Sequence, residues 1–266
     1  MKSTLKIFLL FICIIAFTPN LILAQTIESI ENDLSITLKR IDSFSYLSLR
    51  TDPTAFDSLI HENSILKEKL LRYSMSNPQM LTYEFPLLNN LGFYKATSPD
   101  HTFCIFSWDT QTGGTMHFFE NIAVYEQYGK RYTKQFEKEE GTPGGFYTDI
   151  FQLTDELNTF YIAHEHRILS NSDCYQALHT FDFEKDQFDD NFKKIKTKSG
   201  LTNTLGFSYN FFSVVDRKER PVKLITFNNK LNTLTIPVVT SEGQVTAKQI
   251  VYQYDGDYFV KLAPKK

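Results

Sequence analysis

Residues 98–109 read SPDHTFCIFSWD, a turn followed at once by a strand-like run. Serine, proline and aspartate at the start favour a tight turn, and the aromatic and β-branched residues after them favour a strand. The same alternation continues from about Leu81 to Leu262, where short stretches rich in Phe, Tyr, Ile, Val and Thr are separated by Gly, Pro, Asn and Asp. This pattern predicts roughly a dozen strands.

The candidate turns between these strands are short. Antiparallel strands can be joined by a few residues, whereas a parallel crossover needs about a dozen or more. We therefore expect an antiparallel meander that forms a curved sheet, a sandwich or an incomplete barrel, and the pattern excludes folds in which helices alternate with strands. The turns that support this expectation are Ser98–His101, Thr112–Gly114, Gly129–Lys130, Gly141–Gly145, Asp155–Glu156, Asn171–Asp173, Lys185–Asp186, Asn228–Asn229, Glu242–Gly243 and Asp255–Gly256.

Residues 98–109 also resemble the inner hairpin of a β-propeller blade. The stretch has no second copy in the chain, and no internal repeat of blade length is present. At four strands per blade, about a dozen strands would make only about three blades, whereas propellers have at least about four. The resemblance is therefore interpreted as a turn signature, and no family is assigned.

Two segments upstream of the strands have the periodicity of amphipathic helices. Apolar residues recur every three or four positions over 26–49 and again over 53–76. Asp52 and Pro53 suit the start of the second helix, as a capping carboxylate and a first-turn proline. The short link predicts an antiparallel helical hairpin. We expect a helical hairpin at 25–80 and an antiparallel β domain at 81–266, an α+β fold that is mainly β.

Residues 1–24 have the composition of a secretory signal peptide. Two lysines accompany an apolar run from Ile7 to Phe17, and Ala24 precedes the polar Gln25. This run is much shorter than the roughly 20 residues that a transmembrane helix needs. We expect cleavage near Ala24 and a periplasmic or secreted protein without a membrane span.

Charge and motifs narrow the possible functions. The chain has 28 basic and 31 acidic residues and a formal net charge of −3, so a nucleic acid partner is not expected. Its glycine-rich stretches, 111–115 and 141–145, lack the lysine of a phosphate loop and lead into predicted strands. Residues 206–210 begin like a nucleophile elbow but lack its closing glycine. No cofactor is expected.

His164 and His166 have the spacing of metal ligands. In a strand, residues i and i+2 share a face, so two imidazoles could hold zinc or copper if a third ligand joined them. His179, on the next predicted strand, is the natural third ligand. If Ile168 pairs with Cys174, the His179 side chain points to the other face of the sheet. If the register slips by one residue, His179 pairs directly with His164 and lies on the same face. We favour a polar pair at a wet strand end over a metal site.

Two cysteines, Cys104 and Cys174, would remain after Cys13 leaves with the signal segment. In an oxidising compartment these two could form a disulfide. The alternative is two separate buried thiols, which are common in protein cores. The sequence leaves both alternatives open.

Aromatic residues are abundant, with 24 Phe and 14 Tyr. On a solvated sheet face, tyrosines could stack on sugars or contact another protein, although we expect most of them to pack inside the molecule. The candidates in predicted strands are Tyr125, Tyr128, Tyr132, Tyr147 and Tyr161.

Two functional hypotheses follow. The first is an exported, non-enzymatic binding or structural module of the cell envelope, whose partner is an envelope protein or a glycan. The alternative is an envelope hydrolase with an acidic or histidine site assembled from several strands. A flat aromatic face would favour binding, and a deep pocket with converging ionisable groups would favour the hydrolase. Sequence spacing does not show which carboxylates would share a cleft among Asp149, Asp155, Glu156, Glu165 and Asp182.

Overall fold

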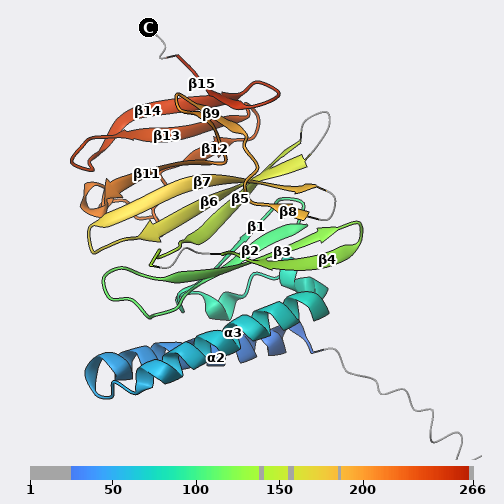
Figure 1. Cartoon of the computed structure of the whole chain (residues 1–266), viewed down its shortest axis with the longest axis vertical. Helices are drawn as coiled ribbons and strands as arrows, with labels where there is room; N and C mark the ends of the chain where they lie inside the picture. Colours follow the sequence, from blue (N-terminus) through green and yellow to red (C-terminus); the bar gives the residue numbers. More distant parts are fainter. Residues whose placement is uncertain (1–24, 138–140, 155–158, 185–186, 264–266) are drawn as a thin grey trace, which may run out of the picture.

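The computed structural model describes residues 25–137, 141–154, 159–184 and 187–263. These residues form four layers in a row, one of helices and three of β-sheet (Figure 1). The predicted class, a helical hairpin followed by mainly antiparallel strands, is confirmed. The expected signal segment and the turns predicted at 155–156 and 185–186 lie outside the described residues.

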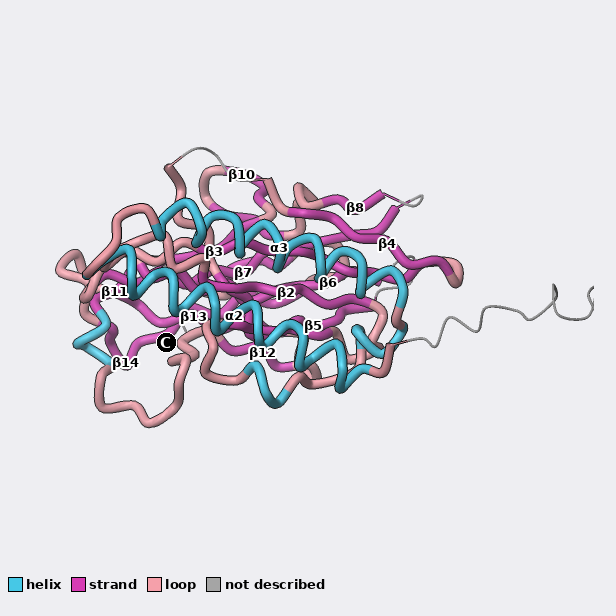
Figure 2. Tube along the Cα trace, turned by 90° about the horizontal axis from the view of Figure 1, so that it is seen from below, coloured by secondary structure: helices cyan, strands magenta, loops and turns pink. Residues whose placement is uncertain are grey.

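The helical layer consists of α2 (Ile27–Arg50) and α3 (Ala55–Ser76). Thr26 caps α2 by accepting a hydrogen bond from the Ser29 N–H. The helix α3 begins two residues later than predicted, because the Asp52 carboxylate accepts from the Thr54 N–H in the preceding turn. Both helices run along the strands on one outer face of the stack (Figure 2). No helix in the described ranges is long and apolar enough to cross a membrane.

The first sheet is a four-stranded meander in the order β1-β2-β3-β4. Even-numbered residues of β2, such as Phe106 and Trp108, pack against the helices, whereas odd-numbered residues, such as Phe103 and Ile105, pack against the second sheet. The helical hairpin and the first sheet therefore share one core. The strands are β1 (Phe93–Thr97), β2 (Phe103–Asp109), β3 (Phe119–Gln127) and β4 (Lys130–Gln135), preceded by the short 3₁₀ helices η1 (Pro78–Leu81) and η2 (Pro86–Leu88).

The turn that joins β1 to β2 is the predicted Ser98–His101 turn. The Ser98 side chain accepts a hydrogen bond from the Phe103 N–H at 3.0 Å and donates one to Asp100. The blade-like hairpin therefore exists as a turn and two strands. The three sheets are open, and they lie face to face in a row (Figure 1).

The second sheet has the order β11-β7-β6-β5, with β8 paired to β7. Apolar residues of its central strand pack on both sides: Phe160 and Ile162 face the third sheet, and Tyr161 and Ala163 face the first. The strands are β5 (Phe146–Thr154), β6 (Thr159–Ile168), β7 (Asp173–Glu184), β8 (Gln187–Asp189) and β11 (Thr204–Asn210).

The third sheet has the order β10-β9-β15-β14-β13-β12, and it corrects the expectation of a simple antiparallel meander. The strands β9 and β15 pair in parallel, which their long connection allows. The chain also leaves the second sheet to form β9 and β10 and then returns, so that β11 pairs with β7. The bounds are β9 (Ile195–Thr197), β10 (Gly200–Thr202), η3 (Phe211–Val214), β12 (Thr226–Asn228), β13 (Thr233–Val239), β14 (Val245–Tyr254) and β15 (Phe259–Lys261).

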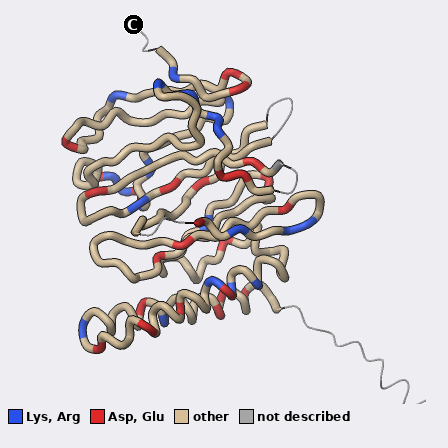
Figure 3. Tube along the Cα trace, viewed as in Figure 1, with Lys and Arg blue, Asp and Glu red and all other residues tan. Residues whose placement is uncertain are grey.

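Charged residues of both signs are distributed over all four layers (Figure 3). This mixture agrees with the nearly balanced formal charge. The few charges that lie inside the stack, between the sheets, define the region in which a functional site can be sought.

Candidate functional site

The strand β6 carries polar side chains on both of its buried faces. His164 and His166 point to the side of the third sheet, and Glu165 and Arg167 point to the side of the first sheet. His179 belongs to the face of Glu165, because its Nε2 lies 2.8 Å from Glu165 Oε2. The three histidines are therefore divided between two faces.

The strand register explains this division. Ile168 pairs with Cys174, and Ala163 pairs with His179, which is the first of the two registers considered from the sequence. No group of three or more His, Cys, Asp or Glu side chains within the described residues is placed to hold a metal ion. The pair His164–His166 does not gain His179 as a third ligand.

His164 is buried completely, which corrects the interpretation of the histidines as a pair at a wet strand end. Its Nε2 lies 3.0 Å from Gln176 Oε1, an oxygen that also accepts from the Leu224 N–H. Since a carbonyl oxygen only accepts, His164 Nε2 carries the proton. The opposite nitrogen, Nδ1, is buried without a hydrogen-bond partner in the part of the chain that is described, and it lies 3.7 Å from Asp149 Oδ2.

His166 is held in one tautomer by its neighbours. The Thr148 hydroxyl donates to Asp149 at 2.7 Å, so its oxygen accepts from His166 Nε2–H at 3.0 Å. Burial, followed by the proximity of His164 and Lys223, holds the pKa of His166 well below its usual range. Its imidazole is therefore neutral near pH 7 and a weak base.

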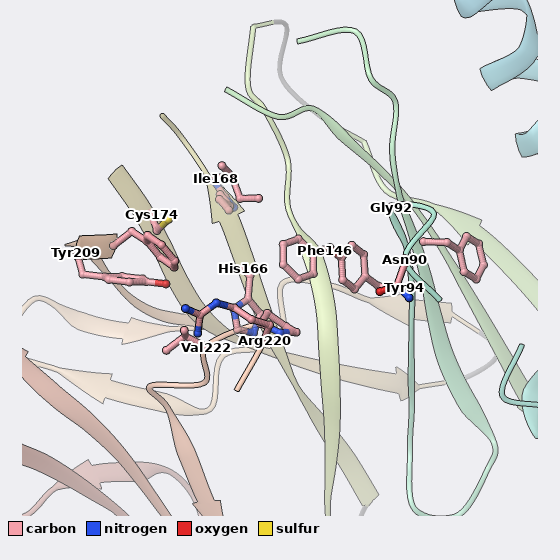
Figure 4. A pocket seen from close by; sticks show the side chains of 14 residues that line it. Asn90, Gly92, Tyr94, Phe146, His166, Ile168, Cys174, Tyr209, Arg220 and Val222 are labelled. Carbon is pink, nitrogen blue, oxygen red and sulfur yellow. The ribbon is translucent and has the colours of Figure 1, made fainter. Parts of the chain in front are cut away.

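A cavity of about 340 Å³ lies beside His166, and we call it the aromatic pocket. Tyr94 from β1 stacks on Phe146 from β5, with ring centroids 4.0 Å apart, and Phe146 stacks on His166 at 5.1 Å. Figure 4 shows Tyr94 and Phe146 on one side of the pocket and Tyr209 on the other, with His166 and Arg220 between them. The wall is mainly apolar, completed by Phe93, Ile168, Cys174, Phe211, Pro221 and Val222.

The polar groups of the aromatic pocket are suited to binding. Burial raises the pKa of the Cys174 thiol and raises the pKa of Tyr209 to about 12, so both groups are uncharged. The Arg220 guanidinium donates to the backbone carbonyls of Arg217, Glu219 and Val215, which fixes its loop. No carboxylate belongs to the described lining of this pocket.

A second cavity, of about 270 Å³, lies on the opposite face of β6, and we call it the inter-sheet pocket. At its base, Arg167 Nε donates to Glu165 Oε1 and Arg167 Nη2 donates to Glu165 Oε2, both at 2.9 Å, and His179 Nε2 lies 2.8 Å from the same Oε2. Burial alone would raise the pKa of Glu165, but the charge and hydrogen bond of His179, together with those of Arg167, lower it. Glu165 is therefore ionised although it is only 3% exposed.

One hydrogen-bonded chain has the order of a hydrolytic site. Glu165 accepts from His179 Nε2, and Thr204 Oγ1 lies 3.1 Å from His179 Nδ1, so that an acid, a base and a hydroxyl are in sequence. Thr204, however, does not belong to the lining of the inter-sheet pocket, and the Arg167 fork compensates the charge of Glu165. A substrate in this pocket would meet the imidazole without meeting the hydroxyl.

The two cysteines are free thiols in the structure, so the Cys104–Cys174 bond left open by the sequence is not formed. They pack in different hydrophobic clusters, Cys104 between the helices and the first sheet and Cys174 beside β11. Burial raises the pKa of Cys104 to about 12. The thiols therefore behave as core side chains.

The candidate tyrosines do not form a flat aromatic face. Tyr125, Tyr147 and Tyr161 are buried, Tyr132 is half-buried, and Tyr128 is exposed in a turn. Among the candidate carboxylates, Asp149 and Glu165 enter the two networks on opposite faces of the second sheet, and Asp182 is buried elsewhere on β7. Asp155 and Glu156 lie outside the described residues.

Sequence reasoning missed most of the residues around the histidines. Arg220 and Lys223 lie far from the histidines in the chain, and no local pattern marks these two residues or Gln176 as partners. The signal that was available is the His-Glu-His-Arg run at 164–167 in an otherwise apolar strand. A buried charged residue needs a partner, so this run indicated polar networks on both faces of the strand.

Comparison with known proteins adds no assignment. No model of a known protein family matches the sequence, and no curated protein is significantly similar to it. The function must therefore be argued from the two pockets themselves.

Proposed function

We propose that this protein is an exported binding module of the cell envelope that captures a small ring-bearing ligand in the aromatic pocket. The observation that carries this proposal is the column of stacked rings formed by Tyr94, Phe146 and His166 at the wall of the pocket. Stacked, rigid rings offer a large apolar surface at little cost in side-chain entropy.

The ionisation state of the pocket supports binding over catalysis. A nucleophile or general base needs a pKa near the working pH, whereas the pKa of Cys174 is raised and the pKa of His166 is lowered. The pocket therefore holds a weak base and an unreactive thiol. Its volume, about 340 Å³, is at the small end of ligand pockets, which are about 300–1,000 Å³.

The charge of the lining indicates the ligand class. Arg220 contributes a positive charge and no described lining residue contributes a carboxylate, so the pocket favours a neutral or anionic ligand. Sugars stack their C–H faces on aromatic rings, and a guanidinium matches a carboxylate in geometry. We therefore propose an acidic sugar of an envelope glycan as the ligand, with its ring beside Tyr94, the half-buried end of the ring column, and its carboxylate towards Arg220.

Titration with glucuronate and with glucose, followed by saturation-transfer NMR and calorimetry, tests this function. We expect glucuronate to bind at least about tenfold more tightly than glucose, the difference expected for one charge-assisted hydrogen bond. Arg220→Gln should remove this preference, whereas Lys248→Gln, an exposed cation on β14, should keep it. Equal affinity for both sugars, absence of binding, or an unchanged preference in Arg220→Gln would contradict the proposal.

A hydrolase remains a second candidate function because of the Glu165–His179–Thr204 chain. If Thr204 is the nucleophile, its oxygen should displace fluoride from a fluorophosphonate, so that the wild-type protein gains the mass of the reagent less HF and Thr204→Val gains none. Absence of labelling in the wild type, under conditions that label a serine hydrolase, would remove this candidate.

A further inference from the structure

We infer that the inter-sheet pocket is a second ligand site, which takes a small organic cation with an N–H donor, a primary ammonium ion. It lies between the first and second sheets, on the face of β6 opposite to His166. The inference rests on an unpaired buried oxygen, on the rings of the wall and on the charges of the mouth.

The unpaired oxygen belongs to Asn121, a residue of β3 that lines the pocket and is 5% exposed. Its Nδ2 donates to the Gly145 carbonyl at 3.0 Å, which fixes the orientation of the amide. The other amide atom, Oδ1, is buried without a hydrogen-bond partner among the residues that the structure describes. An unpaired buried acceptor is unfavourable, so a ligand that donates an N–H to it gains free energy.

The walls of the pocket favour a cation. Phe136, Tyr147 and Phe181 supply aromatic rings, and Tyr147 meets Phe136 edge-on at a centroid distance of 5.7 Å. Aromatic faces attract ammonium groups, most strongly when the site is partly desolvated. An ammonium held by these rings would lie beside Asn121, which lines the same pocket.

Among the described residues that line the pocket, acidic side chains outnumber basic ones. Glu137 and Asp190 line it with exposed carboxylates. The buried pair at the base adds no excess charge, because Arg167 compensates the ionised Glu165 through two hydrogen bonds. A cation is therefore attracted to the mouth and does not need to displace an internal ion pair.

The site does not depend on the proposed function of the aromatic pocket. Arg167 lines both cavities, but the ring column belongs to the aromatic pocket and Asn121 to the inter-sheet pocket. Changes at Asn121 and at Arg220 therefore test the two sites separately.

Titration with benzylammonium, benzyl alcohol and benzoate, observed by NMR on the full-length protein, tests the inference. The three probes share a ring and differ in charge and in donor capacity. We expect benzylammonium to bind at least about tenfold more tightly than benzyl alcohol, and benzoate to bind most weakly, because a charge-assisted hydrogen bond and the carboxylates act on the ammonium alone.

Three variants locate the binding. Asn121→Leu removes the acceptor and should weaken benzylammonium binding about tenfold. Asp190→Asn removes one mouth carboxylate without changing a buried group and should weaken binding about threefold, with a reduced dependence on salt. Asp257→Asn makes the same charge change in an exposed turn of the third sheet and should leave binding unchanged.

Each outcome decides. The site is supported if benzylammonium binds more tightly than benzyl alcohol, and if Asp190→Asn weakens this preference whereas Asp257→Asn does not. This result supports the site even if Asn121→Leu does not fold. Equal binding of benzylammonium and benzyl alcohol would overturn it. An unchanged affinity in folded Asn121→Leu, or equal effects of the two aspartate variants, would overturn it as well.

Discussion

Glu165 and His166 are neighbours on β6, yet their side chains line different pockets on opposite faces of the second sheet. Because side chains alternate along a strand, a slip of one residue in the register would exchange the two groups between the pockets. The pairing of Ile168 with Cys174 therefore determines both candidate sites. The predictions below test the contacts that hold this arrangement and the charge states that it implies.

Gly145 permits the close contact between β5 and β6. A Cβ added at this residue would lie 2.6 Å from Glu165 Oε1 and 2.6 Å from the His166 carbonyl oxygen. Gly145→Ala should therefore lower the free energy of unfolding by about 1–3 kcal/mol, the usual cost of overpacking. Urea denaturation measures this loss. Gly114→Ala, where a Cβ meets nothing within 4 Å, is the matched control, and equal stability of the two variants would contradict the contact.

Asn63 joins the helical hairpin to the first sheet. Its Nδ2 donates to the carbonyls of Leu59 and Thr110, both at 2.9 Å, and its Oδ1 accepts from Trp108 Nε1–H at 3.0 Å. Asn63→Ala should cost about 2–4 kcal/mol in the free energy of unfolding, because the indole N–H and the Thr110 carbonyl lose their partner inside the core.

The control for Asn63→Ala is Asn32→Ala, on the exposed side of α2, which should change the free energy of unfolding by less than about 0.5 kcal/mol. Chemical denaturation of both variants compares them directly. A small effect at Asn63 would mean that the hairpin does not depend on this polar link.

The local pattern of the sequence was sufficient to predict the helices and most strands. The stripe of apolar residues in α2 and the Asp52–Pro53 turn that precedes α3 depend on neighbours within one or two turns. The Ser98–His101 turn likewise contains its own hydrogen-bonding groups. The pairing of β9 with β15 could not be predicted, because strands so far apart in the chain carry no local mark of their partner.

The candidate site could be predicted only in part. Because side chains alternate along a strand, the sequence predicted that His164 and His166 share one face. The two possible registers of the hairpin left two alternatives for the face that carries His179. The burial of the pair could not be predicted, because it depends on a remote segment: the Val222 carbonyl and the Leu224 N–H bind Gln176, which in turn binds His164. The turn at 171–173 suggested that this end of the strand is solvated, but the segment that contains Val222 and Leu224 covers it.

The lowered pKa of His166 predicts a pH dependence of stability. Below about pH 6.5 the unfolded chain gains a proton on this residue and the folded chain does not, so the unfolded state is favoured as the pH falls. His166→Gln can still donate to Thr148 and should remove a slope of up to about 1.4 kcal/mol per pH unit between about pH 6.5 and pH 5.

Urea denaturation at several pH values measures that slope. His61→Gln, an exposed substitution on α3, is the control and should retain the slope of the wild type. If His166→Gln also retains it, His166 is protonated in the folded protein, and the argument that the aromatic pocket holds a weak base fails.

The free thiols predict the outcome of alkylation. Unfolded protein, never exposed to a reductant, should take up one label at Cys104 and one at Cys174, because the two side chains belong to separate clusters. Native protein should leave Cys104 unlabelled, since it is fully buried and its pKa is raised to about 12. Cys174 lines the aromatic pocket and should react slowly, because its raised pKa keeps the reactive thiolate scarce. Mass spectrometry counts the labels, and Cys174→Ala should abolish the native one. An unfolded chain that takes no label would show that the two cysteines are joined, which would contradict the free thiols of the structure.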